Sequence, residues 1–290
     1  MTYRELCARL SSAGIENAEW DAALLIEHFC GTDASLVPTY PDKNFNSSAL
    51  EVAADKRTAR YPLQYLLGEW QFYRQTYEVS PDCLIPRSDT EILVEEAINA
   101  LPHGARFADL CTGSGCIAIS VLAERPDTQA VAVEKYPNTL SLATRNAARN
   151  GVSDRFVPLC ADVLTDHFLP DGEQFDAILS NPPYIPEGDL ASLAPELDAE
   201  PRAALDGGDD GLLFYRQILK IAPTYLKTGG CLLFEIGYDQ ADALRELGLA
   251  AGFTDCHVIR DFGGNDRVVK FKMQSAKCKI VNNSNILDIS

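Results

Sequence analysis

The chain has 290 residues, of which 46% are hydrophobic, and a formal net charge of -17 at pH 7. This length allows one large α/β domain and a smaller one, and the acidic balance argues against a broad electrostatic grip on phosphates, so we expect no direct nucleic-acid binding. Because the sequence has no run of 18 or more apolar residues and no basic-then-apolar start, we expect a soluble, cytoplasmic protein without a membrane partner.

Residues 1–75 are predicted to form a small domain of short amphipathic helices. One helix is expected to end just before Gly31, because glycine readily takes the left-handed conformation that closes a helix. A second helix is expected to run through residues 50–57, whose apolar side chains recur at helical spacing.

A hairpin and linker are predicted between the two domains, and we assign them residues 76–100. Short-period alternation over residues 68–73 and again over 77–79 favours a β-hairpin that bridges the domains. The acidic segment Asp89-Thr90-Glu91 is then expected to open a helix, since negative side chains stabilise the N-terminus of a helix.

Residues 101–273 are predicted to form a doubly wound α/β sheet, because apolar strands alternate with helices. The strands are expected over residues 106–110, 130–133, 155–159, 175–180 and 231–236. The last two strands, 256–260 and 267–272, have no helix between them and predict an antiparallel hairpin at the sheet edge. The polar, aperiodic residues 274–290 are expected to be disordered.

A glycine-rich turn follows the first of these strands and leads into a helix. Gly113 and Gly115 permit a tight turn and the close approach of a ligand to the backbone, as a nucleotide-binding loop requires. The candidate cofactor-binding residues are Asp109, Cys111, Thr112, Gly113, Ser114, Gly115, Glu134, Asp162, Val163 and Asn181. Neither the nine cysteines nor the four histidines show metal-ligand spacing, so we expect no metal site.

Two interpretations of this loop stay open on its residues alone. Gly113, Gly115 and Ala118 satisfy the dinucleotide pattern G-x-G-x-x-A, and Glu134 lies at roughly the distance expected for ribose recognition, which predicts a nicotinamide dehydrogenase. Hydride transfer leaves Asp109 unexplained, together with the polar residues that follow the third and fourth strands. These residues fit a methyl donor site.

The segment Asn181-Pro182-Pro183-Tyr184 closes the strand expected over residues 175–180. The Asn181 side-chain oxygen and a main-chain carbonyl of the Pro-Pro pair can accept both hydrogens of one planar NH2 group. The prolines hold that carbonyl rigid, and Tyr184 offers a flat face to a planar substrate. The four residues therefore predict a catalytic and substrate-binding clamp for an amide or amine nitrogen.

Together, the glycine loop, Glu134 and the Asn-Pro-Pro-Tyr clamp resemble the class I S-adenosylmethionine-dependent methyltransferases that modify planar nitrogen. The resemblance implies that S-adenosylmethionine is the cofactor, that Glu134 accepts its ribose hydroxyls and that Asp162 lies near its adenine amine. Cys111 departs from the motif, which usually has glycine at this position.

Residues 84–91, 68–72 and 200–211 closely resemble the peptide chain release factor glutamine methyltransferases, a likeness that extends over about residues 65–271. It implies methylation of the glutamine in the Gly-Gly-Gln motif of release factors, which would be the protein partners, and a helical domain that helps to bind them. Phe72, expected to pack on the amide plane together with Tyr184, and Arg87 and Glu91 are further substrate-binding candidates. For Arg87 and Glu91, an ion pair and a cap at the start of a helix are the alternative roles.

Three alternatives to this function stay open. A glutamine methyltransferase of a ribosomal protein shares the clamp, although the segment Asp89-Thr90-Glu91 favours the release factor enzymes. A nucleic-acid amino-group methyltransferase would need a basic face, which the acidic composition argues against. A non-catalytic adaptor would be expected to have lost the clamp residues, which are intact.

Overall fold

The computed structural model describes residues 1–273, and the tail predicted to be disordered lies outside the described residues. The chain divides into two compact units. The first comprises residues 1–70, 79–85 and 192–201, and the second comprises the remaining described residues. Within residues 1–273, the helices are all too short or too polar to span a bilayer.

The first unit is built from helices, as predicted. They are α1 (Tyr3–Ser12), α2 (Ala18–Cys30), α3 (Ser48–Thr58) and α4 (Leu63–Leu67), with the 3-10 turns η1 (Val37–Thr39) and η4 (Pro195–Ala199). Helix α2 ends at Gly31, whose φ of 68° is left-handed. Helix α3 turns Leu50 and Arg57 inward, and the buried Arg57 guanidinium pairs with Asp21 at 2.7 Å.

A two-stranded sheet pairs β1 (Glu69–Phe72) with β2 (Gln75–Glu78), so a hairpin forms as predicted but lies mostly before the residues 76–100 assigned to hairpin and linker. Its turn contains Tyr73 at a φ of 55°, and the Tyr73 N–H donates to the Glu91 carboxylate at 2.8 Å. Glu91 is the first residue of helix α5 and so fixes the hairpin turn to the start of that helix.

The second unit contains a seven-stranded sheet with the order β5-β4-β3-β6-β7-β9-β8. The first five strands in this order are parallel, and β9 pairs antiparallel with both β7 and β8. This arrangement confirms the predicted α/β class with a terminal antiparallel hairpin. The strands are β3 (Arg106–Leu110), β4 (Gln129–Glu134), β5 (Phe156–Cys160), β6 (Phe175–Ser180), β7 (Leu226–Glu235), β8 (Phe253–Arg260) and β9 (Asp266–Met273).

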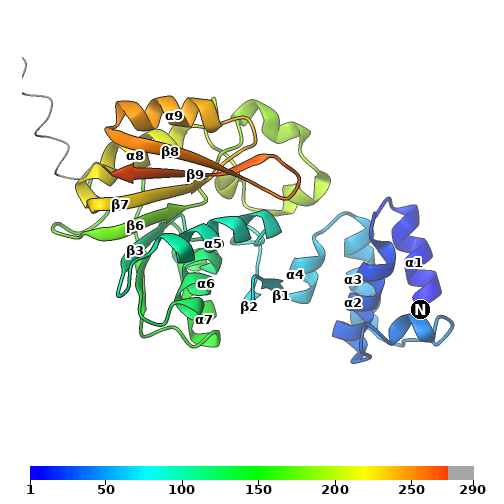
Figure 1. Cartoon of the computed structure of the whole chain (residues 1–290). Helices are drawn as coiled ribbons and strands as arrows, with labels where there is room; N and C mark the ends of the chain where they lie inside the picture. Colours follow the sequence, from blue (N-terminus) through cyan, green and yellow to red (C-terminus); the bar gives the residue numbers. More distant parts are fainter. Residues whose placement is uncertain (274–290) are drawn as a thin grey trace, which may run out of the picture. The chain divides into compact units, whose positions relative to one another are not determined.

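The helices of this unit cover both faces of the sheet (Figure 1). They are α5 (Glu91–Ala100), α6 (Cys116–Glu124), α7 (Pro137–Arg149), α8 (Leu213–Tyr225) and α9 (Ala241–Ala250), with the 3-10 turns η2 (Ser88–Thr90), η3 (Glu187–Ser192) and η5 (Arg202–Ala204). Alternate strand residues face opposite clusters: Phe107 packs with residues of α5, α6 and α7, and Ala108 with residues of α8 and α9. Each face of the sheet is therefore part of an apolar core.

Strand β7 is longer than predicted. It begins at Leu226 rather than at Cys231, because Leu226 pairs with Phe175 of the neighbouring strand β6. The register shifts before the next pair, Ala177 with Cys231, and Gly229 lies in the bulge with a φ of 80°. The glycine here therefore marks an irregularity within the strand rather than its start.

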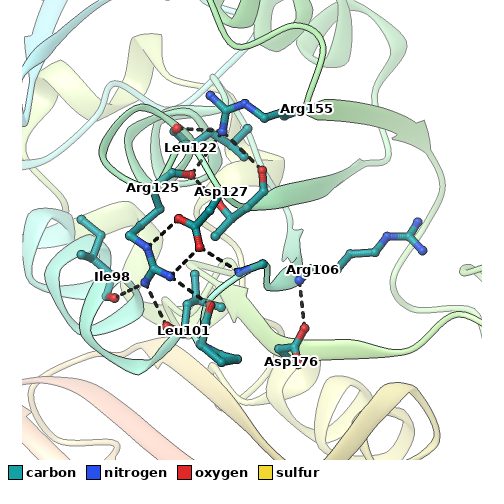
Figure 2. Close-up of polar contacts among 11 residues, drawn as sticks. Ile98, Leu101, Arg106, Leu122, Arg125, Asp127, Arg155 and Asp176 are labelled. Carbon is teal, nitrogen blue, oxygen red and sulfur yellow. Dashed lines mark hydrogen bonds and ion pairs between the residues drawn. The ribbon is translucent and has the colours of Figure 1, made fainter.

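Near the amino ends of the strands, arginine side chains form a polar network with main-chain carbonyls (Figure 2). Arg125 donates to the main-chain carbonyls of Ile98 and Leu101, both at 2.9 Å, and its guanidinium pairs with Asp127 at 3.0 Å. Arg155 donates to three further carbonyls, those of Leu122, Arg125 and Thr128. These side chains satisfy main-chain groups at loop and helix ends, so this edge of the sheet has a structural role.

Candidate active site

The predicted site residues gather at the carboxyl edge of the parallel strands. Leu110, at the end of β3, pairs with Val133 on one side and with Ser180 on the other. The glycine loop, Glu134 and Asn181 directly follow or end these three neighbouring strands. Ligands of open α/β sheets bind at this edge, where the loops after the strands meet.

The glycine loop has three residues in the left-handed region. Gly113 and Gly115 have φ values of 57° and 81°, and Cys111 reaches 59°. A side chain in this conformation costs about 1–2 kcal/mol, so the structure explains why glycine is usual where this chain has Cys111. The loop is held in place by the Asn146 side chain, which donates to the Ser114 carbonyl at 2.9 Å.

Glu134 ends β4 and turns its carboxylate toward the loop. One oxygen accepts the Gly113 N–H and the other accepts the Tyr136 N–H, each at 3.1 Å. The residue is 8% exposed, and burial raises the pKa of its carboxyl. Each oxygen keeps lone pairs for further donors, as recognition of two neighbouring hydroxyl groups requires.

Asp109 is fully buried beneath the loop. Its Oδ2 accepts the Thr112 hydroxyl at 2.6 Å and the Ala118 N–H at 3.2 Å, so it joins the loop to the first turn of α6. Its Oδ1 has no hydrogen-bond partner within the described residues, and burial raises the pKa of the carboxyl to about 7. This placement makes Asp109 a residue that shapes the loop.

Asp162 and Val163 follow β5 next to Glu134. The Asp162 carboxylate pairs with Lys135 at 2.9 Å and accepts the Leu164 N–H at 2.9 Å, whereas the Val163 side chain is 4% exposed and packs in the core. In residues 1–273, no group of three or more His, Cys, Asp or Glu side chains is arranged to hold a metal ion.

The two loop glycines differ in the space around them. A Cβ on Gly113 would have nothing within 4 Å, whereas one on Gly115 would lie 2.8 Å from Ile119 Cδ1 and 3.3 Å from Ala143 Cβ. Gly115 is therefore needed for the packing of α6 and α7, and Gly113 leaves open space over the loop. With the Glu134 carboxylate beside that space, the residues present fit a nucleoside with its ribose hydroxyls.

The clamp segment leaves β6 on a rigid main chain. Pro182 and Pro183 are buried, and the Tyr184 carbonyl accepts the Gln240 side-chain N–H at 3.0 Å. A Cβ on Gly211 would lie 2.3 Å from that carbonyl oxygen, so glycine lets the segment after η5 pack directly on the Tyr184 backbone. The clamp backbone is thus held by its own buried prolines and by the contacts that Gln240 and Gly211 make with Tyr184.

The Tyr184 ring packs partly against the core on the α8 and α9 face. Burial raises the pKa of its phenol to about 12, and the charges of Arg267 and Arg87 partly oppose that shift. The Arg87 charge therefore acts on the Tyr184 phenol, and a substrate-binding role for Arg87 stays a prediction. The Glu91 carboxylate accepts the Tyr73 N–H of the hairpin turn, which is not the helix cap given as its alternative role, and its substrate-binding role stays a prediction.

The structure does not place Phe72 beside Tyr184, where it was predicted to help cover the substrate amide. Phe72 is 2% exposed and meets Tyr77 edge to face, with ring centroids 5.9 Å apart. It belongs to the core that contains α5 and α6, whereas Tyr184 packs against the core on the other face of the sheet. The strand β1 turns Phe72 inward because its alternation leaves only this residue buried.

Two buried polar residues behind Asn181 were not predicted. Glu235, at the end of β7, is 2% exposed, and Thr90, at the end of η2, is also 2% exposed. The Asn181 Nδ2 donates to Thr90 Oγ1 at 3.4 Å, and both side chains lie close enough to the Glu235 carboxyl to lower its pKa. The sequence signal that could have revealed Glu235 is an ionisable residue inside the apolar run of residues 231–236.

Comparison with known proteins places these features in a family. Residues 2–68 match the family described as PrmC N-terminal domain, and residues 88–214 match the Methyltransferase small domain. A solved methyltransferase from Pyrococcus furiosus shares the fold, with a TM-score of 0.51 and 18% identity over 68% of this chain and 88% of that chain.

Two curated relatives are similar over nearly the whole chain. The release factor glutamine methyltransferase of Geobacter sulfurreducens is 44% identical over 265 residues, which cover 90% of this chain and 91% of that protein. The protein of the same name from Cereibacter sphaeroides is 41% identical over 277 residues, 94% of this chain and 98% of that protein. The chain therefore belongs to the family of release factor glutamine methyltransferases, enzymes that use S-adenosylmethionine as their methyl donor.

Proposed function

We propose that this protein methylates the side-chain amide nitrogen of the glutamine in the Gly-Gly-Gln motif of peptide chain release factors. The observation that carries the proposal is the position of the Asn181 amide beside the glycine loop, at the ends of neighbouring strands. An acceptor for amide hydrogens lies there next to a loop suited to a nucleoside. The names of the curated relatives support the choice of release factors as the protein substrate.

The chemistry depends mainly on positioning. A primary amide is a weak nucleophile, because its nitrogen lone pair is delocalised into the carbonyl. Asn181 Oδ1 and the Pro182 carbonyl would accept the two amide hydrogens and hold the nitrogen in line for attack, an entropic advantage. The same acceptors favour the positive charge that develops on nitrogen. Tyr184 would cover the amide plane and exclude water.

S-adenosylmethionine supplies an electrophilic methyl group when it is bound. We assign its ribose hydroxyls to the Glu134 carboxylate and its adenine amine to Asp162. Thr112, Ser114 and the two loop glycines would line the cofactor through their main chain, since the side chains of Thr112 and Ser114 are buried. The helical domain of residues 1–75 would bind the release factor.

The test is transfer of a labelled methyl group from S-adenosylmethionine to a purified release factor, with mass mapping of the product. A release factor whose Gly-Gly-Gln glutamine is replaced by asparagine serves as the control. Label on that glutamine, and none on the control, would establish the enzyme, substrate and site together. Label elsewhere, or label on a ribosomal protein instead, would overturn the proposal.

A further inference from the structure

Glu235 lies beside the clamp but has no place in the chemistry described so far. Strand β7 runs next to β6, with Phe234 opposite Ser180, so Glu235 and Asn181 are the next residues on the two chains. Glu235 is almost fully buried, and its Oε2 has no hydrogen-bond partner within the described residues. A buried carboxyl with a free oxygen is costly to fold, which makes a structural purpose alone a weak explanation.

The Asn181 amide can face the substrate in two ways, and only one is productive. Its oxygen must point at the substrate nitrogen, because an NH2 group there would meet another pair of donors. In the structure the Asn181 Nδ2 is directed toward Thr90 Oγ1 at 3.4 Å, and the Glu235 carboxyl lies close enough for Asn181 and Thr90 both to lower its pKa. An ionised carboxylate only accepts hydrogen bonds, so it selects the NH2 side of the amide.

We propose that Glu235, supported by Thr90, is a positioning residue that holds the Asn181 amide with its oxygen toward the substrate nitrogen. The inference rests on the proposed function, since it concerns the same clamp. Glu235 acts only through Asn181. A direct role as proton acceptor does not fit, because Glu235 and Thr90 are each 2% exposed and lie behind Asn181.

The charge of Glu235 determines whether this orientation is enforced. The charged or titratable groups that interact with it are Arg267 on β9, Asp89 on η2, Tyr184 after the clamp and Tyr215 on α8. Burial outweighs the opposing hydrogen bonds and the Arg267 charge, and it raises the pKa of Glu235 to about 7. A protonated Glu235 can donate to the amide oxygen and so permits the reversed amide. Turnover therefore rises as pH increases through about 7.

The test compares wild type, Glu235→Gln and Thr90→Val on the release factor substrate across pH 6–9. Glutamine keeps the shape but can also donate, so we expect kcat to fall on the order of 100-fold, with KM for both substrates nearly unchanged and the acidic limb of the pH profile lost. Thr90→Val should lower kcat on the order of tenfold and keep the limb. The matched control is Glu96→Gln on α5, which removes a carboxylate that pairs with Lys270 at 3.4 Å. This variant should behave as wild type.

A second readout does not depend on turnover or on folding of the Glu235 variant. The side-chain NH2 signals of Asn181 in 15N-labelled wild type, identified by their loss in Asn181→Asp, should titrate with a midpoint near pH 7. Signals that do not move with pH, or an active Glu235→Gln protein with unchanged kcat and pH profile, would overturn the positioning role. Wild type that leaves the release factor unmethylated would instead refute the proposed function, and the NMR titration would still decide the role of Glu235.

Discussion

Replacing Glu134 with alanine removes the carboxylate between the glycine loop and the space above Gly113. In the free protein this carboxylate accepts two main-chain N–H groups at 3.1 Å and is only 8% exposed. Folding has therefore already removed most of the water around this carboxylate. Ribose hydroxyls can then hydrogen-bond to it with little further desolvation cost.

The expected loss follows from these contacts. A hydrogen bond to a charged acceptor contributes about 1.5–3 kcal/mol, and two ribose hydroxyls are available. Taking the lower value for each gives about 3 kcal/mol, which corresponds to a rise of about 100-fold in the Kd for S-adenosylmethionine. The Glu134→Gln variant keeps one acceptor oxygen and should lose about tenfold.

Titration calorimetry of S-adenosylmethionine into wild type, Glu134→Ala and Glu134→Gln measures these differences directly. Thermal unfolding of each protein shows whether the loop change has also disturbed the fold. A Kd for folded Glu134→Ala within threefold of the wild-type value would refute the assignment of the ribose to this carboxylate.

Three further predictions concern the clamp, the loop and the buried carboxyl beneath it. Asn181→Ala should lower kcat about 100-fold and leave the Kd for S-adenosylmethionine nearly unchanged, and near-normal methyl transfer would remove the clamp from the mechanism. Gly115→Ala should lower the free energy of unfolding in urea by about 2 kcal/mol, because a left-handed alanine is strained and its Cβ meets Ile119. Gly113→Ala should cost about 1 kcal/mol and mainly weaken cofactor binding. Equal stabilities of the two variants would contradict the packing role of Gly115. Asp109→Asn removes a carboxyl whose pKa rises from 3.8 to about 7 on folding. Between these pH values the carboxyl keeps its proton in the native protein but has lost it in the unfolded chain. Its contribution to the free energy of unfolding is therefore complete below about pH 4 and is lost as the pH rises toward 7, by at most about 1.4 kcal/mol per pH unit. The wild-type free energy of unfolding should thus fall more steeply from pH 5 to 7 than that of Asp109→Asn, and parallel curves would show that Asp109 titrates normally.

The sheet could be predicted largely from the sequence. Strands β3 and β6 were predicted to the residue, because each is a short apolar run bounded by clear turn signals, and the β8–β9 hairpin followed from the absence of a helix between its strands. The start of β7 could not be predicted. Its first residues pair with β6 across a bulge, and the glycines there have the composition of a turn.

The site residues that lie at the ends of strands could be predicted, and those that reach the site through packing of adjacent elements could not. The glycine loop, Glu134 and Asn181 each follow a strand of a parallel sheet, so the fold itself brings them to one edge. Glu235 and Thr90 meet Asn181 only because β7 lies beside β6 and η2 packs there. The orientation of Phe72 was mistaken because an aromatic residue on a hairpin can face a ligand or a core with equal sequence support.

The first unit is assembled from distant parts of the chain. Glu196 accepts hydrogen bonds from Arg57 at 3.3 Å and from Arg60 at 3.1 Å, although about 140 residues separate them. During synthesis, the two guanidinium groups can therefore pair with Glu196 only after the intervening part of the second unit has been made. A fragment that contains only residues 1–75 would lack Glu196 and keep the Arg57–Asp21 pair, so we expect the separately expressed helices to be less stable unless the segment 192–201 is supplied.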